Sequence, residues 1–229
     1  MSEFDNHSFD YDKLIDQDIR VSGESIDYFA SYKARCVKEF LGCSFKGSIL
    51  DYGCGVGIGA KHLKRYFDSQ KVAITGYDVS KESIQRAIEE VKDIIFIGEF
   101  EKISKESFDV IIVANVIHHI RQEERPDFFI KISGLLKKNG YIFIFEHNPY
   151  NPITRSVVKK SILDRDASLI ELKATGKMLK QAGISILKKR YIVFFPRYLK
   201  ALRFLEPILG VVPMGAQYLC VGKMTMSLR

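Results

Sequence analysis

Short apolar runs alternate with amphipathic segments of helix length through the middle of this chain. The apolar runs have the length and β-branched content of strands and lie at 48–52, 72–78, 94–98, 108–116 and 141–147. The segments with helical periodicity lie at 25–41, 58–67, 81–91 and 122–137, and Gly140 is the expected left-handed cap of the last. This alternation predicts an α/β fold: a mostly parallel sheet with right-handed crossovers and helices on both faces.

The alternation of strands and helices ends after the fifth predicted strand. The segment 148–155 is expected to be a turn-rich loop, in which Pro149 and Pro152 break regular structure. Beyond it, the patterns predict one helix and then two strands, at 171–182, 184–195 and 216–224. No complete βα unit joins these two strands, so we expect them to form an antiparallel edge of the sheet.

The stretch "ILDYGCGVGIGA", Ile49–Ala60, connects the first predicted strand to the helix that follows it. Four of its residues are glycines, namely Gly53, Gly55, Gly57 and Gly59. Glycine permits a positive φ and lets a ligand approach the backbone closely. Because ligands of open parallel sheets bind at the carboxyl ends of the strands, we expect this loop to hold a cofactor.

Two classes of cofactor compete for the loop. "GVGIGA" fits the G-x-G-x-x-A fingerprint of dinucleotide-binding domains, and Asp78 would bind a ribose in either class. Asp51 favours S-adenosylmethionine, because a carboxylate there attracts a cationic amino-acid group and repels a pyrophosphate. Glu99 can accept a hydrogen bond from an adenine amino group. The chain also lacks the second mononucleotide-binding half of a dinucleotide domain.

Five motifs, in order and correctly spaced, resemble those of the class I S-adenosylmethionine-dependent methyltransferases. They are "ILDYGCGVG", "GYDVS", "IGEFEKI", "SFDVIIVANVIHHI" and "LLKKNGYIFIFEHNP". The resemblance runs from residue 47 to residue 149 and weakens beyond it. It implies a Rossmann-like, seven-stranded sheet with an antiparallel last strand. The nearest subgroup resembles small methyltransferases that act on lipid, quinone, sugar or other small substrates.

The resemblance also implies which residues contact the cofactor. They are Asp51, Gly53, Cys54, Gly55 and Gly57 for the methionine end, Asp78 for the ribose, Val79, Glu99 and Phe100 for the adenine, and Asn115 and Val116 for the sulfonium side. Cys54 stands where the family often has cysteine or serine, so it need not be a nucleophile.

His118 and His119 in "NVIHHI" are the candidate catalytic bases, because histidine titrates near neutral pH and can take a proton from the acceptor. The alternative is that one or both only close the loop after the fourth strand through backbone hydrogen bonds. Glu146 and Asn148, around the end of the fifth strand, are expected to shape the substrate mouth.

A metal site is a further alternative at the same place. Asn115, His118 and His119, together with Glu146 and His147, would supply nitrogen and oxygen ligands. Some quinone-type relatives hold a divalent ion with carboxylates in this loop. This chain has Asn115 and His118 at the matching positions, so we expect no metal.

Residues 1–46 are expected to form a helical lid over the cofactor, and 47–229 a single methyltransferase domain. Tyr11, Tyr28 and Tyr32 are predicted near the substrate, with Phe29 buried in the core.

The formal net charge of +7 is concentrated in residues 151–229. Within them, 188–210 combines basic and apolar residues, which suits peripheral contact with an anionic membrane. The part beyond the predicted strand, from Arg197 onward, predicts an amphipathic helix that Pro207 ends or bends. RNA binding is the alternative use of this charge.

The polar N-terminus shows no signal pattern, so we expect a cytoplasmic protein, with the inner face of the membrane as a second location.

These observations predict an S-adenosylmethionine-dependent methyltransferase that releases S-adenosylhomocysteine. The expected acceptor is a small molecule or a lipid-linked one, such as a cell-envelope glycan, and the expected state is a monomer or homodimer without nucleic acid. The alternatives are an RNA-directed methyltransferase, an NAD-dependent oxidoreductase and a cofactor-binding module without catalysis.

Overall fold

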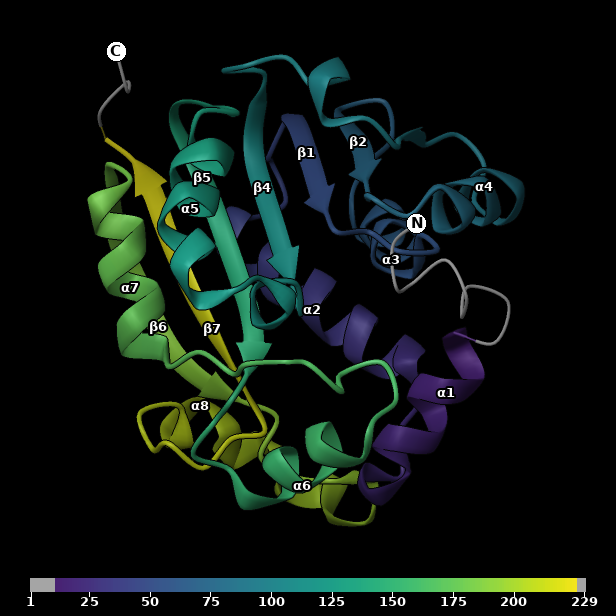
Figure 1. Cartoon of the computed structure of the whole chain (residues 1–229), viewed down its shortest axis with the longest axis vertical. Helices are drawn as coiled ribbons and strands as arrows, with labels where there is room; N and C mark the ends of the chain where they lie inside the picture. Colours follow the sequence, from purple (N-terminus) through teal and green to yellow (C-terminus); the bar gives the residue numbers. More distant parts are fainter. Residues whose placement is uncertain (1–10, 226–229) are drawn as a thin grey trace.

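The structure is a computed structural model that describes residues 11–225, with side chains from residue 14 onward. At its centre, the described residues form a seven-stranded sheet in the order β3-β2-β1-β4-β5-β7-β6 (Figure 1). The strands are β1 (Gly47–Tyr52), β2 (Val72–Tyr77), β3 (Ile95–Ile97), β4 (Phe108–Ala114), β5 (Leu136–His147), β6 (Ile184–Ile192) and β7 (Gln217–Met224).

Strands β1 to β5 pair in parallel, whereas β7 runs antiparallel to both of its neighbours, β5 and β6. This confirms the predicted parallel core with an antiparallel edge. The core strands are apolar on both faces, as in β4, where Val110 and Ile111 are both fully buried but point to opposite sides.

Helices cover both faces of the sheet. The described α-helices are α1 (Tyr11–Asp18), α2 (Ile26–Leu41), α3 (Ile58–Tyr66), α4 (Lys81–Glu90), α5 (Arg125–Ser133), α6 (Pro152–Lys160), α7 (Leu172–Gln181) and α8 (Glu206–Leu209). On one face, α2 and α3 pack through Val37 and Leu63 onto strand residues such as Ile49. On the other, α5 and α7 pack through Phe129 and Leu179.

The end of α5 differs from the prediction. The helix stops at Ser133, and β5 begins at Leu136 instead of residue 141. The residue with a left-handed backbone is Asn139, at φ 65°, whereas Gly140 lies inside β5. The long basic and polar beginning of β5 has no apolar run, and for this reason the sequence pattern missed it.

The two proline-containing segments also differ from the prediction. Pro152 starts α6 instead of breaking it, because proline fits the first helical turn, and the Asn151 side chain caps the helix by accepting a hydrogen bond from Thr154 N at 2.9 Å. The expected amphipathic helix is a 3₁₀ segment, η6 (Arg197–Leu205), followed by the short α8. Pro207 lies in the first turn of α8 and does not end it.

Helix α1 lies near the carboxyl ends of the parallel strands, as does α6. Figure 1 shows α1 and α6 at the end of the sheet toward which the arrows of β1, β4 and β5 point. Tyr11 begins α1, but its side chain falls outside the described residues. No helix within 11–225 is both long enough and apolar enough to span a membrane.

Candidate active site

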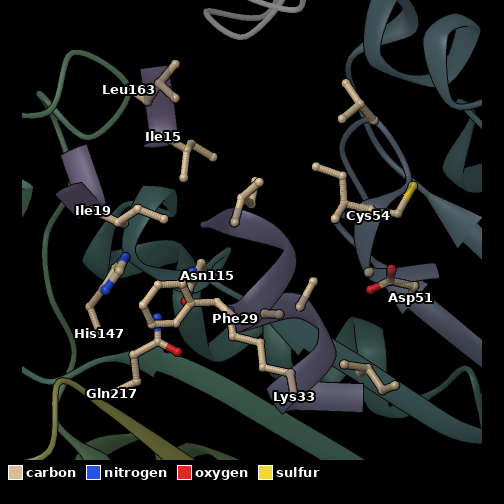
Figure 2. Close-up of a pocket in the computed structure, with 18 of the residues that line it drawn as sticks. Ile15, Ile19, Phe29, Lys33, Asp51, Cys54, Asn115, His147, Leu163 and Gln217 are labelled. Atoms are coloured by element: carbon tan, nitrogen blue, oxygen red, sulfur yellow. The ribbon is translucent and has the colours of Figure 1, made fainter. Parts of the chain in front are cut away.

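A cavity of about 220 Å³ lies at the carboxyl ends of β1, β4 and β5. It extends from the glycine turn after β1 to the loop that follows α6. One face of α2 lines it with residues at helical spacing, namely Ile26, Phe29, Ala30, Lys33, Ala34 and Val37. Figure 2 shows the side chains of this helix pointing toward Asn115 and His147 across the cavity. The helices α1 and α2 therefore cover the site.

The turn between β1 and α3 needs glycine for its backbone and for its packing. Gly53, Gly55 and Gly57 have φ values of 77°, 51° and 85°, which L side chains rarely adopt. A Cβ atom on Gly53 would lie 2.3 Å from Cγ2 of Val116. Gly53 N donates a hydrogen bond of 2.7 Å to Tyr77 O, which ties the turn to the end of β2.

Asp51 and Lys33 place opposite charges at this end of the cavity. Asp51 is 5% exposed, and its Oδ2 has no hydrogen-bond partner. Burial raises the pKa of Asp51 to about 7, against the opposing charge of Lys33. Burial lowers the pKa of Lys33 to about 8, against the carboxylates of Glu146 and Asp51. A carboxylate and an ammonium group that face one cavity fit the zwitterionic end of an amino acid, as in S-adenosylmethionine.

Cys54 also lines the cavity, beside Asp51. Burial raises the pKa of the Cys54 thiol well above its usual value. The thiol is therefore protonated at neutral pH, which agrees with the expectation that it need not be a nucleophile.

The predicted ribose contact, Asp78, lies at the end of β2 outside this cavity. Its Oδ2 accepts a hydrogen bond of 2.8 Å from Gly55 N, and its Oδ1 accepts one of 2.9 Å from Ser80 N. The carboxylate is thereby fixed against the glycine turn. Gly55 and Gly57 do not line the cavity either.

The predicted adenine contacts lie further along the strand ends. Val79 is 61% exposed, and the exposed Glu99 accepts a hydrogen bond of 2.7 Å from Lys102 Nζ. Phe100 is partly buried, with Lys131 Nζ 3.6 Å from its ring centroid. The cavity thus reaches three of the residues predicted for the methionine end, Asp51, Gly53 and Cys54, and the assignments of the methionine, ribose and adenine contacts all stay predictions.

At the other end of the cavity, Glu146 holds His118 in place. His118 lies on the 3₁₀ segment η4 (Ile117–His119) that follows β4, and it is 1% exposed. Its Nδ1 is 2.6 Å from Glu146 Oε2. Glu146 also accepts hydrogen bonds from Val116 N at 2.9 Å and Ile117 N at 2.6 Å. Glu146 is fully buried behind η4, so the expectation that it shapes the substrate mouth is wrong.

Asp164, in the loop between α6 and α7, completes a group that we call the histidine cluster: His118, His119, His147, Glu146 and Asp164. Asp164 Oδ1 lies 3.3 Å from His118 Nε2 and 3.4 Å from His119 Nε2. The ring centroids of His118 and His147 are 5.1 Å apart. Ser168 N donates a hydrogen bond of 2.8 Å to His118 O, which anchors this loop to η4.

The charge differs among the three histidines. Burial opposes a charge on His118, yet Glu146 and Asp164 raise its pKa to about 9. Burial and the charge on His118 together lower the pKa of both His119 and His147 to about 4. Of the two predicted bases, only His119 is therefore neutral at pH 7, and a quarter of its side chain is exposed.

Unpartnered polar atoms concentrate in this cavity. Among the described residues, the buried side-chain atoms that lack a hydrogen-bond partner include Asp51 Oδ2, Asn115 Oδ1, His118 Nε2 and Gln217 Oε1. All four residues line the cavity. Buried polar groups are normally satisfied, so this concentration indicates a site for a polar ligand.

Residues 50–144 match the family model described as "methyltransferase domain". These residues therefore hold a methyltransferase domain, and the fold is that of solved S-adenosylmethionine-dependent methyltransferases. Such a domain uses S-adenosylmethionine as its cofactor, which agrees with the charges of Asp51 and Lys33.

Known relatives resemble this methyltransferase over part or all of its length. Over 144 residues it is 30% identical to phosphoethanolamine N-methyltransferase 1 of Arabidopsis thaliana, a match that covers 60% of this chain and 28% of that protein. The chain thus spans less than a third of that relative's length. A possible histamine N-methyltransferase from Thermotoga maritima superposes with a TM-score of 0.69 at 17% identity, covering 96% of this chain and 98% of that one.

A third comparison is with a structure that contains the cofactor. Phosphoethanolamine N-methyltransferase 2 of Haemonchus contortus, solved in complex with S-adenosyl-L-methionine, superposes with a TM-score of 0.63 at 18% identity. The match covers 85% of this chain and 52% of that one. At these identities, the solved structures establish the fold of this methyltransferase but not its acceptor.

The lid aromatics of the methyltransferase are arranged differently from the prediction. Phe29 lines the cavity instead of being only a core residue. Tyr32 points away and donates a hydrogen bond of 3.1 Å to Glu206 Oε2, and the Tyr28 ring packs against the guanidinium of Arg203. Neither tyrosine lines the cavity. Neighbouring positions of a helix point to different faces. The sequence alone does not tell which face borders the cavity and which borders the core.

Two other predicted contacts are directed away from the cavity. The Val116 side chain packs over Gly53, and only the preceding residue, Asn115, lines the site. Asn148 is fully buried, and its amide donates hydrogen bonds to Pro213 O at 3.1 Å and Gly215 O at 2.7 Å. These bonds hold the segment before β7, so the predicted substrate role of Asn148 is wrong.

The sequence analysis did not assign several polar residues that line the site, among them Lys33, Asp164 and Gln217. Lys33 had a usable signal, because it is a charged residue inside the apolar face of α2. Gln217 begins β7 next to the end of β5, a position that only the strand pairing with His147 reveals. Asp164 lies in an irregular loop and belongs to no recognised motif.

Proposed function

We propose that this methyltransferase modifies a small molecule enclosed beneath α1 and α2. The cavity carries this proposal, because it joins the predicted methionine end, at Asp51 and Gly53, to His119 in one continuous space. Its volume of about 220 Å³ is below the ~300–1,000 Å³ that is typical of ligand pockets. A macromolecular acceptor would have to insert a single small group.

Each part of the site has a role in this reaction. When bound, S-adenosylmethionine supplies an electrophilic methyl group on a positively charged sulfur. Asp51 and Lys33 bind its amino-acid end, and Asp78 binds the ribose. The apolar residues Ile15 and Phe29 exclude water and orient the acceptor. His119 reaches the cavity with part of its ring and takes the acceptor's proton.

The charge of the cavity supports an uncharged or cationic acceptor. Its described lining holds three aspartates, Asp18, Asp51 and Asp164. Among the described residues, Lys33 is the only lysine or arginine that lines it. A phosphomonoester such as phosphoethanolamine, which the names of the plant relatives specify, would find only Lys33 and the His118 imidazolium, whose charge Glu146 and Asp164 already balance. We therefore infer a different acceptor for this protein.

A labelled-methyl assay tests the proposal. Purified protein is incubated with methyl-labelled S-adenosylmethionine and, in separate reactions, with a low-molecular-weight metabolite extract, with RNA and with lipid vesicles. We expect label in a small molecule, and His119→Gln should lower kcat while the Kd for S-adenosylhomocysteine stays unchanged. Label that enters only RNA would overturn the proposal, as would a protein whose melting temperature rises with NAD but not with S-adenosylhomocysteine.

A lipid-linked acceptor is the second candidate, favoured by an exposed surface next to the lid. In η6 and α8, the side chains of Tyr198, Phe204 and Ile208 are 77%, 72% and 76% exposed. Arg203 ties this segment to the lid region through Glu24, at 2.7 Å. An acceptor held in a membrane would then lie beside the covered cavity.

A further inference from the structure

The histidine cluster places three potential metal ligands around one point. One ligand atom each from His118, His147 and Asp164 all lie within 4.8 Å of one another. The three residues come from η4, from the end of β5 and from the loop after α6, so the tertiary fold assembles the group. All three line the cavity, and Figure 2 shows His147 pointing into it.

Glu146 orients His118 as a ligand. It engages Nδ1 at 2.6 Å, which leaves Nε2 on the cavity side. That Nε2 is buried and has no hydrogen-bond partner, although Asp164 Oδ1 is 3.3 Å away. A carboxylate bound to the far nitrogen of a histidine is the usual support of a metal-ligating imidazole.

The distances suit a transition metal. Two ligands that each bind a Zn²⁺ ion at about 2.0–2.1 Å in tetrahedral geometry are themselves ~3.3 Å apart. His118 Nε2 and Asp164 Oδ1 are already at this separation. The ligand atom of His147 lies within 4.8 Å of the other two, so it needs to move by at most about 1.5 Å to reach the same separation.

We propose that His118, His147 and Asp164 bind one divalent transition-metal ion, of the kind that two imidazoles and a carboxylate select: Zn²⁺, Co²⁺ or Fe²⁺. The sequence led us to expect no metal, so this proposal departs from that expectation. The ligand set also differs from the metal alternative considered from the sequence, because it includes Asp164 and excludes Asn115. Three protein ligands leave a coordination position open toward the cavity. In a role that rests on the proposed function, this position holds the acceptor's nucleophilic atom.

A metal-free arrangement is the competing explanation. His118, if protonated, can bridge the carboxylates of Glu146 and Asp164 as an ion triad. That arrangement gives His147 no role and requires no metal. The two explanations therefore differ in metal content and in the effect of replacing His147.

Co²⁺ is the probe that separates them, because its visible d–d bands report its ligands. The full-length protein is treated with a chelator and titrated with Co²⁺. We expect one equivalent to bind, with the intense bands of a four- or five-coordinate ion that Zn²⁺ then displaces. His147→Gln and Asp164→Asn should each lose these bands. Two matched controls should keep them: Asp166→Asn, an exposed aspartate in the same loop, and His119→Gln.

Each outcome bears on the proposal. Absence of saturable binding, or bands that survive in both ligand variants, would overturn the metal site in favour of the ion triad. Loss of the bands in His119→Gln would overturn the ligand set. Circular dichroism establishes that each variant is folded. Binding of S-adenosylhomocysteine is measured on the same samples. A protein that binds S-adenosylhomocysteine but not Co²⁺ refutes only the metal site. A protein that binds Co²⁺ but not S-adenosylhomocysteine refutes only the proposed function.

Discussion

Asp51 sets the pH dependence of cofactor binding at the scale of single residues. Its carboxylate must be ionised to bind the cofactor's ammonium group, and burial raises its pKa to about 7. The affinity for S-adenosylhomocysteine should therefore fall as the pH drops through about 7. Asp51→Asn should weaken binding at pH 8 on the order of 10- to 100-fold, which is the size of one charged hydrogen bond. The variant should also lose the fall in affinity at low pH, which we call the acid limb of the profile. Isothermal titration calorimetry between pH 6 and pH 9 measures both effects.

The control for Asp51 is Glu89→Gln, which removes an exposed carboxylate on α4. Its pH profile should match that of the wild type. An Asp51→Asn variant that kept the acid limb would show that another group binds the cofactor's amine.

Lys33 should produce the opposite limb of the same profile. Burial lowers its pKa to about 8, so its positive charge is lost, and with it the attraction for the cofactor's carboxylate, as the pH rises through that value. Lys33→Met should abolish this basic limb. Because Lys33 also lowers the pKa of Asp51, the acid limb should move to higher pH in the same variant. An acid limb that stayed in place in the calorimetric profile would contradict the coupling of the two groups.

At the scale of elements, the β1–α3 turn depends on Gly53. Gly53→Ala adds a Cβ at φ 77°, where it would lie 2.3 Å from Val116 Cγ2. We expect a loss of about 1–3 kcal/mol in the free energy of unfolding, and a Tm lower by roughly 2–12 °C for a chain of this size. Gly42→Ala measures the cost of backbone strain without a clash, since φ 81° and ψ 174° favour glycine and nothing lies within 4 Å of its Cβ. Equal Tm losses in differential scanning calorimetry would mean that backbone strain alone, not Val116, requires the glycine.

Elements with a strong local signal could be predicted from the sequence. The buried strand β4 is a continuous apolar run, and α2 keeps its apolar spacing over four turns, so the predicted and observed bounds agree closely. Signals that have two interpretations led to errors. Pro152 can end a helix or start one, and only the Asn151 cap decides. In η6, helical periodicity is present, but the residues form a 3₁₀ segment in which Leu199 departs from helical angles.

At the scale of the whole molecule, the two halves of the site differ in how far sequence could predict them. The cofactor end is local, since Asp51 and Gly53 belong to one motif around one turn. The acceptor end combines residues that are remote in the chain, such as Ile15, His119, Asp164 and Gln217. No periodicity or spacing connects these positions. The antiparallel pairing of β5 with β7 brings Gln217 beside His147, and the bond from Ser168 anchors the Asp164 loop to η4.

The exposed surface of η6 and α8 predicts how the whole molecule behaves at a membrane. Arg197 and Lys200 are exposed beside Phe204 and Ile208, and the chain carries a formal net charge of +7. Apolar side chains that enter the interface and cations that face anionic headgroups act together. We expect the protein to co-sediment with phosphatidylglycerol vesicles and not with phosphatidylcholine vesicles. Phe204→Ser should weaken this binding about 10- to 100-fold, from the ~1.5–3 kcal/mol gained by burying such a side chain.

The matched control is Ile95→Ser, because Ile95 is 67% exposed on β3, at the opposite edge of the sheet from β6. It should bind phosphatidylglycerol vesicles like the wild type. If Ile95→Ser and Phe204→Ser lowered binding equally, the contact would be diffuse attraction by the net charge rather than a docked surface.

Arg203 ties this surface to the lid region, so docking there should also slow opening of the lid. Dissociation of S-adenosylhomocysteine, followed by stopped-flow fluorescence of a labelled analogue, should then be slower with phosphatidylglycerol vesicles, and an unchanged rate would separate membrane contact from access to the cavity.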